Sequence, residues 1–125
     1  MYEYYNPNPK LLNVGDCVIR AITKALGISW ETAYAGLSAK GFELSDMPSA
    51  NHVWGAYLRS KGFRRFIIDA EDDNYSVRDF CMDYPSGTYV LALQGHVVAV
   101  VNGVYFDSWD SGDERPLYYW RREYE

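Results

Sequence analysis

Hydrophobic positions in the first half of the chain recur at helical spacing. Three segments carry an apolar stripe on one helical face, each ending in a glycine, and they span residues 15–27, 29–41 and 49–62. Asp16 and Ser29 are residue types that cap helices, and Gly27 and Gly41 are placed to end them. We therefore predict three helices, preceded by an extended lead-in over the first dozen residues.

The pattern then changes to runs that are typical of strands. After a run at 63–68 and a short amphipathic helix expected at 76–85, four further runs lie at 88–93, 96–101, 104–109 and 116–121. Turn-forming residues separate these four runs. Helices followed by an antiparallel sheet predict a single α+β domain over 1–125, with a helical part at about 13–62 and a sheet part at about 63–123.

Composition and charge disfavour several classes of function. The chain of 125 residues is 48% hydrophobic and 23% charged, which fits one globular domain. Its net charge of −5 without a basic block argues against a nucleic-acid partner. No apolar run approaches the roughly 20 residues of a membrane-spanning helix, so no membrane partner is expected. The first residues lack a secretory signal pattern, and the two cysteines give no disulfide framework, so we expect a reducing, cytoplasmic compartment.

Tyrosine is frequent, with twelve in the chain and several near each end. Two interpretations fit this pattern. The rings cover the edges of the sheet, or they form a surface for a partner or for self-association.

The segment around Asn102-Gly103 gives the sharpest geometric prediction. Asn-Gly between two apolar runs is typical of a two-residue type I′ hairpin turn. With this turn, alternation along the strands brings His96 and Asp107 to one face as diagonal neighbours. A carboxylate beside an imidazole fixes its tautomer and stabilises its protonated form, as general-base catalysis requires. The alternative is that His96 merely begins one strand and Asp107 merely ends the next.

Two neighbours of this pair have expected positions in the same register. Trp109 lies opposite His96, where it shields the hydrogen bond between His96 and Asp107 from water or packs on the sheet, and the two roles are compatible. Asp110 points to the opposite face and is the weaker candidate acid.

The two cysteines lie in different settings. Cys17 is in the first turn of the first predicted helix, where unpaired backbone N–H groups and the helix dipole stabilise a thiolate. An adjacent imidazolium lowers a thiol pKa further, so Cys17 is a candidate nucleophile, the alternative being a buried structural thiol. Cys81 lies on the apolar stripe of a predicted helix, and we expect it to be structural.

Three motifs together resemble those of the papain-like cysteine peptidases. They are GDCVIRAI around Cys17, GHVVAV around His96 and DSW at 107–109, in the order cysteine, histidine, acid. The last is similar to the family's Asn-Ser-Trp element, and the helix after Asp-Cys looks closest to the compact branch of bacteriocin-leader peptidases and to small bacterial and phage proteins. The resemblance implies a papain-like fold, with N-terminal helices packed on a C-terminal antiparallel sheet.

The resemblance also implies an activity. It makes Cys17 the nucleophile, His96 the general base and then acid, and Asp107 the residue that orients the imidazole. The enzyme would be a cysteine peptidase or amidase that hydrolyses an amide bond of a peptide or protein substrate through a thioester. Two alternatives stay open: an acyltransferase with the same three residues, and a catalytically inactive binding module, such as a phage protein that captures a host factor.

One region departs from the family pattern. Papain-like enzymes place a glutamine five or six residues before the cysteine as an oxyanion donor, whereas this chain has Leu12 and Leu11 there. Asn13 is the amide donor that we consider instead, together with the backbone N–H of Cys17. The alternative for Asn13 is an ordinary turn residue.

The remaining polar candidates give no cofactor site. No cluster of cysteine and histidine has metal-ligand spacing, so we expect neither a metal nor a cofactor. His52 is expected to be solvated or to cap the third helix. Arg20, one turn beyond Cys17, is expected to pair with Asp16 or another acid, the alternative being a substrate contact.

Overall fold

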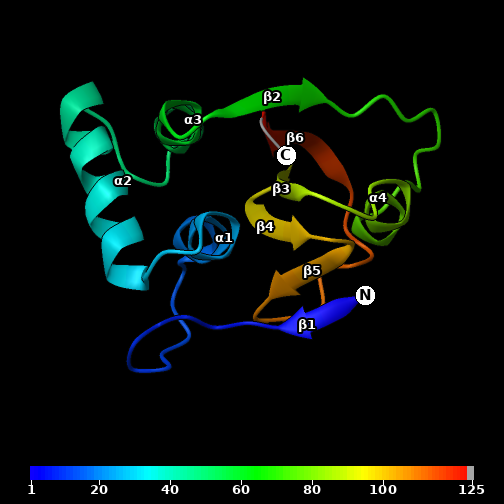
Figure 1. Cartoon of the computed structure of the whole chain (residues 1–125), viewed down its shortest axis with the longest axis horizontal. Coiled ribbons are helices and arrows are strands. Elements are labelled where there is room, and N and C mark those ends of the chain that lie inside the picture. The colour runs from blue at the N-terminus through cyan, green and yellow to red at the C-terminus, as the bar shows by residue number, and fades with distance from the viewer. Residues whose placement is uncertain (124–125) are drawn as a thin grey trace.

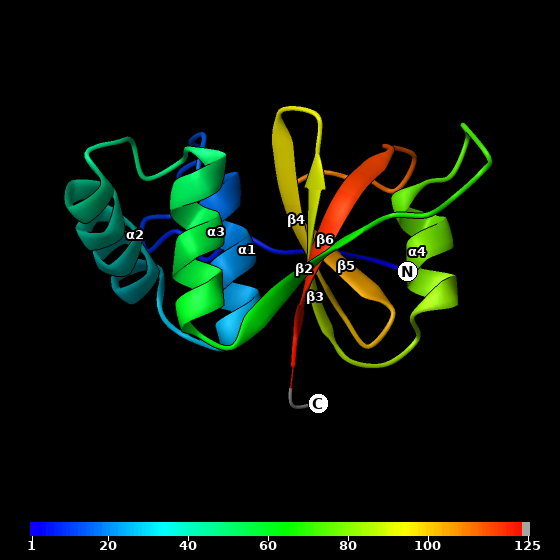
Figure 2. The same cartoon turned by 90° about the horizontal axis from the view of Figure 1, so that it is seen from above.

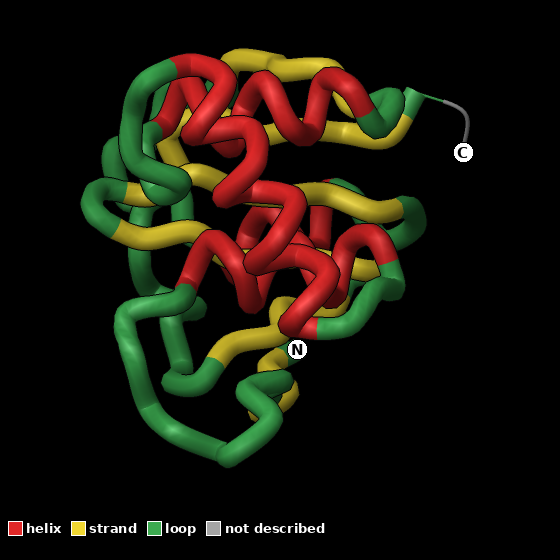
Figure 3. The backbone as a smooth tube through the Cα atoms, turned by 90° about the vertical axis from the view of Figure 1, so that its left-hand side faces the viewer, coloured by secondary structure: helices red, strands yellow, loops and turns green. Residues whose placement is uncertain are grey.

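Helices cover both faces of a central sheet in this computed structural model, which describes residues 1–123. Along the described residues the elements are β1 (Tyr2–Tyr4), α1 (Cys17–Leu26), α2 (Trp30–Leu44), α3 (Asn51–Ser60), β2 (Phe63–Ile67), α4 (Val77–Asp83), β3 (Thr88–Leu93), β4 (His96–Val101), β5 (Val104–Asp107) and β6 (Pro116–Arg122). Figure 2 shows α1, α2 and α3 on one side of the strands and α4 on the other. Figure 3, viewed from the three-helix side, shows these helices in front of the sheet. The α+β class is confirmed.

The sheet is mixed, which corrects the prediction of an antiparallel sheet. Its strand order is β1-β5-β4-β3-β6-β2, with β1 and β2 at the two edges (Figure 1). The pairs among β2 to β6 are antiparallel, but β1 runs parallel to β5, with Tyr2 beside Tyr105. The lead-in, which we expected to be extended, thus contributes the edge strand β1. The sequence did not indicate this pairing, because the partner strand lies about a hundred residues away in the chain.

The ends of the first two helices follow the predicted residue types in part. Gly27 ends α1 in the left-handed conformation (φ 67°), and the Ser29 side chain accepts the backbone N–H of Thr32 at the start of α2. Asp16 precedes α1, but its side chain makes no capping hydrogen bond, which corrects its predicted role. Its carboxylate instead accepts hydrogen bonds from two other side chains, described below.

Helix α2 continues past its predicted end at Gly41. It ends at Leu44, and Ser45 adopts the left-handed conformation (φ 58°). A Cβ on Gly41 would lie 2.7 Å from the carbonyl oxygen of Asp46. Gly41 is therefore required because the chain after the helix returns close to it, and not because the helix stops there.

Each face of the sheet has its own buried cluster. On the three-helix side, residues of α1, α2 and α3 pack against β3, β4 and β6, with Ile22, Trp54 and Trp120 among the buried side chains. On the other side, Phe80 of α4 packs among aromatic rings of β3 and β6. No helix within residues 1–123 has the length and apolar character needed to cross a bilayer.

Several terminal tyrosines pack against other side chains of the domain. The Tyr2 ring lies 5.5 Å from that of Tyr105, and the Tyr5 hydroxyl contacts Thr23 Oγ1 at 2.8 Å. Tyr119 is buried in the α4-side cluster, whereas Tyr4 is 64% exposed. Tyr124 lies outside the described residues. Of these rings, that of Tyr2 covers the sheet at its β1 edge, as one of the two interpretations expects.

Candidate active site

The β4–β5 hairpin has the predicted geometry. Val101 pairs with Val104 across the turn, and Asn102 (φ 50°) and Gly103 (φ 77°) both have the positive φ that a type I′ turn requires. At the far end of the hairpin, Nε2 of His96 lies 2.7 Å from Oδ2 of Asp107. The diagonal contact predicted from the register is therefore present.

Helix α1 brings the sulfur of Cys17 to this end of the hairpin. Cys17 is the first residue of α1, and its thiol lies close enough to the His96 side chain and to the backbone of Val97 for both to lower its pKa. A carboxylate only accepts hydrogen bonds, so the imidazole donates from Nε2 to Asp107. Nδ1 is then the ring nitrogen left to face the thiol. The structure thus joins three residues predicted as a site, from α1, β4 and β5.

The electrostatics favour a thiolate facing an imidazolium. Burial opposes ionisation of Cys17, but the hydrogen bond and positive charge of His96 outweigh it and lower the pKa of the thiol. Burial likewise disfavours the charged imidazole, yet hydrogen bonds to Asp107 and Cys17 raise the pKa of His96 to about 9. The unpaired N–H groups at the start of α1 add to thiolate stability.

Asp107 is fixed from several directions. The residue is 1% exposed, and burial alone would raise its pKa, but hydrogen bonds from His96 and Ser111 hold the pKa of its carboxyl below the usual value. Oδ2 accepts from Ser111 Oγ (2.6 Å), and Oδ1 accepts from the N–H of Ser108 (2.8 Å) and from Nη2 of Arg20 (3.1 Å). A carboxylate held in this way stays ionised and keeps the imidazole in one orientation.

Arg20 connects the nucleophile's helix to the acid. It is 4% exposed, and its guanidinium donates to Asp16 Oδ1 (2.8 Å) as well as to Asp107. Trp30 Nε1 donates to the other oxygen of Asp16 (2.9 Å). The predicted pairing of Arg20 with Asp16 or another acid is therefore confirmed with two acids. The buried arginine compensates both carboxylates and ties α1 to β5.

Aromatic and apolar side chains surround the reactive groups. The Trp109 ring lies 4.9 Å from the His96 ring, so it covers part of the imidazole while remaining 45% exposed itself. Beside Cys17, a cavity of about 80 Å³ is lined by the start of α1, by Leu37 of α2 and by Pro48 and Ser49. This cavity offers room for a small apolar group next to the sulfur.

The other sequence candidates lie apart from these groups. Cys81 is buried in the α4-side cluster, where burial raises its pKa, as expected of a structural thiol. Asp110 is directed towards α4, where it binds Arg78 and accepts the hydroxyl of Tyr105. His52 is exposed and pairs with Asp46 at 3.3 Å. Within residues 1–123, no three acidic, cysteine or histidine side chains are grouped to hold a metal ion.

Asn13 lies on the exposed segment that leads into α1. The structure records no hydrogen bond of its side chain with the described residues, and it precedes the nucleophile by four positions. Its amide is therefore free to donate to a ligand.

Two functional contacts were missed by the sequence analysis. The hydroxyl of Ser111, which is fully buried, supports Asp107 from four residues further along the chain. The backbone of Val97 helps to lower the pKa of the Cys17 thiol. The short spacing of Asp107 and Ser111 was a signal for the first contact, since a turn after a strand brings such residues together. The second depends on how α1 packs on β4, for which the sequence carried no signal.

The comparisons with known proteins add no family assignment. No family model matches the chain, and neither the curated proteins nor the solved structures contain a match to it.

Proposed function

We propose that this protein is a thiol hydrolase, a cysteine peptidase or amidase in which Cys17 is the nucleophile and His96 the acid and base. One observation carries the proposal: the imidazole of His96 is hydrogen-bonded to the buried carboxylate of Asp107 (2.7 Å) and is also close enough to the Cys17 thiol to lower the pKa of that thiol. This is the arrangement that an activated nucleophile, its base and an orienting group require. The helix-to-hairpin placement of the three residues also supports a papain-like fold.

The geometry supports a two-step acyl transfer. The Cys17 thiolate attacks the carbonyl carbon of an amide, and the His96 imidazolium gives its proton to the nitrogen that leaves as the amine. The acyl group stays on the sulfur as a thioester. His96, now neutral, accepts a proton from water as the water attacks the thioester, and the acid product leaves with the thiolate restored. Asp107 stabilises the imidazolium throughout.

Two donors are proposed for the oxyanion of the tetrahedral intermediate. The first is the backbone N–H of Cys17, which has no acceptor within its own helix because it lies in the first turn. The second is the side-chain amide of Asn13. The cavity beside Cys17 is proposed to accept an apolar side chain of a peptide or protein substrate.

Labelling with electrophilic acyl probes tests the proposal. A panel of peptide and simple acyl probes is incubated with the full chain, and the labelled residue is mapped by mass spectrometry. Labelling at Cys17 followed by release of the free acid supports a hydrolase. Release only when an amine is added identifies an acyltransferase, and a Cys17 that stays unmodified by every probe identifies a binding module without catalysis.

We expect the pH profiles of alkylation and turnover to differ. Because the Cys17 pKa is lowered, iodoacetamide should label Cys17 at pH values below the ordinary thiol range, about 8.5. Because His96 loses its proton as the pH rises through about 9, turnover should fall there while alkylation continues. Rates of alkylation and of turnover, measured from about pH 5 to about pH 10.5, check both expectations. Alkylation that rises only with an ordinary thiol pKa would contradict the ion pair.

Asn13→Ala is expected to slow turnover by about 10²-fold or more. The same variant should be alkylated by iodoacetamide at the unchanged rate, because alkylation forms no oxyanion. Val14→Ala, at an exposed neighbouring position, is the matched control and should leave both rates as they are. Equal turnover in the two variants would remove Asn13 from the mechanism and leave it a turn residue.

A further inference from the structure

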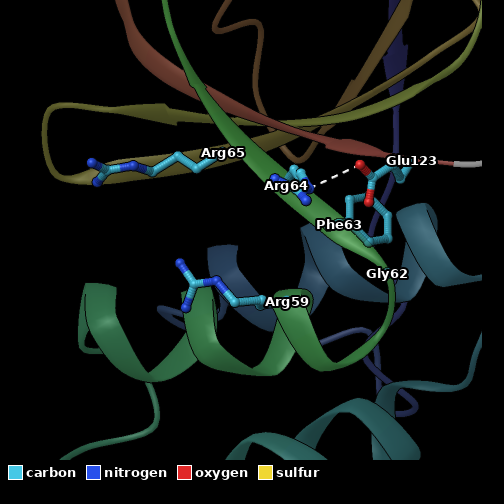
Figure 4. Close-up of a pocket in the computed structure, with 6 residues that line it drawn as sticks. All are labelled: Arg59, Gly62, Phe63, Arg64, Arg65 and Glu123. Atoms are coloured by element: carbon cyan, nitrogen blue, oxygen red, sulfur yellow. Dashed lines mark ion pairs between the residues drawn. The ribbon is translucent and has the colours of Figure 1, made fainter.

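A groove lies between α3 and the edge strand β2, and it shares no residue with the site around Cys17. It consists of two hollows of about 520 and about 460 Å³, and both are lined by Arg59 of α3 and Arg65 of β2. Figure 4 shows these two side chains extending to the same side of the first hollow, while Arg64 turns to Glu123. The second hollow continues along α3, lined also by Asn51, His52, Gly55, Ala56, Tyr118 and Trp120.

The two shared arginines carry uncompensated charge. The Arg59 guanidinium lies 5.2 Å from the Trp120 ring, and that of Arg65 lies 5.0 Å from the Tyr118 ring. Neither side chain has an ion pair with a carboxylate among residues 1–123, whereas Arg64 pairs with Glu123 at 2.8 Å. Stacking on a ring holds a guanidinium in place and leaves its N–H edge free for an anion. In a chain of net charge −5, this groove is a local positive site.

Strand β2 also presents a free backbone edge to the outside of the sheet. The carbonyl of Gly62 accepts from the N–H of Glu123 (3.0 Å), next to the pairing of Phe63 with Arg122 in β6. Backbone groups alternate in direction along an antiparallel strand, so those of Phe63, Arg65 and Ile67 are directed away from β6. Ile67 is also 77% exposed. An edge with free donors and acceptors is a template for another strand.

We propose that this groove binds an extended acidic peptide segment, which adds to β2 as a further strand. Backbone hydrogen bonds to the β2 edge hold the peptide, and carboxylates at alternate positions, which share one face of a strand, bind Arg59 and Arg65. The two arginines supply specificity for acidic side chains, and the edge supplies affinity that is independent of sequence. A guard role, in which the arginines only prevent edge-to-edge association, is an outcome that the test distinguishes.

Fluorescence anisotropy with a labelled peptide tests the groove. The probe is a five-residue peptide of threonine and valine with glutamate at its second and fourth positions, and its comparison has glutamine there. The full chain should bind the glutamate peptide at low salt, and Arg59→Gln or Arg65→Gln should each weaken binding by about tenfold or more. Arg115→Gln changes the net charge equally at an exposed site outside the groove, and should have little effect.

Further measurements separate this proposal from the peptidase. Binding should be the same in Cys17→Ala, so a failed hydrolase test leaves the groove standing, and the reverse also holds. Amide NMR signals of Arg65 and Ile67 should shift on addition of the peptide. The proposal is overturned by equal binding of the glutamate and glutamine peptides, by equal losses in all three arginine variants, by no binding at all, or by full competition from inorganic phosphate without amide shifts along β2.

Discussion

Cys17→Ala is expected to abolish labelling by acyl probes and to lower turnover by about 10⁴-fold or more. The variant removes the only group in the site that forms the covalent bond, and without the sulfur His96 has no nucleophile to activate. The fold should be retained, because the Cys17 side chain is only partly buried at the start of α1. Turnover and mass-spectrometric labelling, with circular dichroism to check the fold, give the measurement.

The second cysteine supplies the matched control. Cys81 is buried among the rings on the α4 side, and its pKa is raised by that burial. Cys81→Ala should therefore keep labelling and turnover close to those of the unaltered chain, at a modest cost in unfolding free energy for the small cavity created. Preferential labelling of Cys81 in the folded protein, or full turnover by Cys17→Ala, would disprove the assignment of the nucleophile.

The contact between His96 and Asp107 was predictable because it depends on local rules. One Asn-Gly turn fixes the register of the hairpin, and strand alternation then determines which side chains meet. The Trp109 ring also lies against His96, but β5 ends at Asp107, so Trp109 reaches the imidazole from the bend after the strand and not from the predicted strand position. The caps at Gly27 and Ser29 are local in the same sense, since each depends on the conformation of one or two residues.

The features that the sequence did not predict depend on contacts between distant segments. β1 pairs with β5 across about a hundred residues, and no periodicity in a three-residue strand indicates its partner. Gly41 looked like a helix end, but it is required by the chain that passes close to it. The sequence predicted that Arg20 pairs with an acid, but not that Asp107 is its second partner, because that bond spans 87 positions and depends on how α1 lies on the sheet.

The buried charges help to explain how helix α1 and the β4–β5 hairpin are held in the relative position that the site needs. Cys17 and Arg20 lie one turn apart on α1, while His96 and Asp107 lie on the hairpin. Each element therefore contributes one partner to a sulfur–imidazole contact and one to a guanidinium–carboxylate contact. Two contacts between the same elements fix the orientation of α1 better than either does alone. Arg20 is thus a positioning residue, and it also adds positive charge near the thiolate.

Arg20→Met is expected to lower the free energy of unfolding by about 3–5 kcal/mol at neutral pH. Methionine fills much of the space but leaves the carboxylate of Asp16 buried without its cation, and that of Asp107 with His96 as its remaining charged partner. Urea denaturation measures the loss. Because Arg20 helps to hold the pKa of the Asp107 carboxyl below its usual value, the difference from the unaltered chain should shrink as the pH falls below about 4. Arg115→Met, at an exposed ion pair with Asp73, is the control and should cost less than about 1 kcal/mol.

A second readout separates positioning from mere stability. Since the charge of Arg20 helps to lower the pKa of Cys17, iodoacetamide labelling of folded Arg20→Met should require a higher pH than labelling of the unaltered chain. Arg20→Lys keeps a positive charge but lacks the planar guanidinium that donates to two carboxylates at once. It should restore part of the labelling profile but less of the free energy of unfolding. An unchanged labelling profile in folded Arg20→Met would reduce Arg20 to a structural ion pair, and a loss of unfolding free energy no larger than that of Arg115→Met would remove even this role.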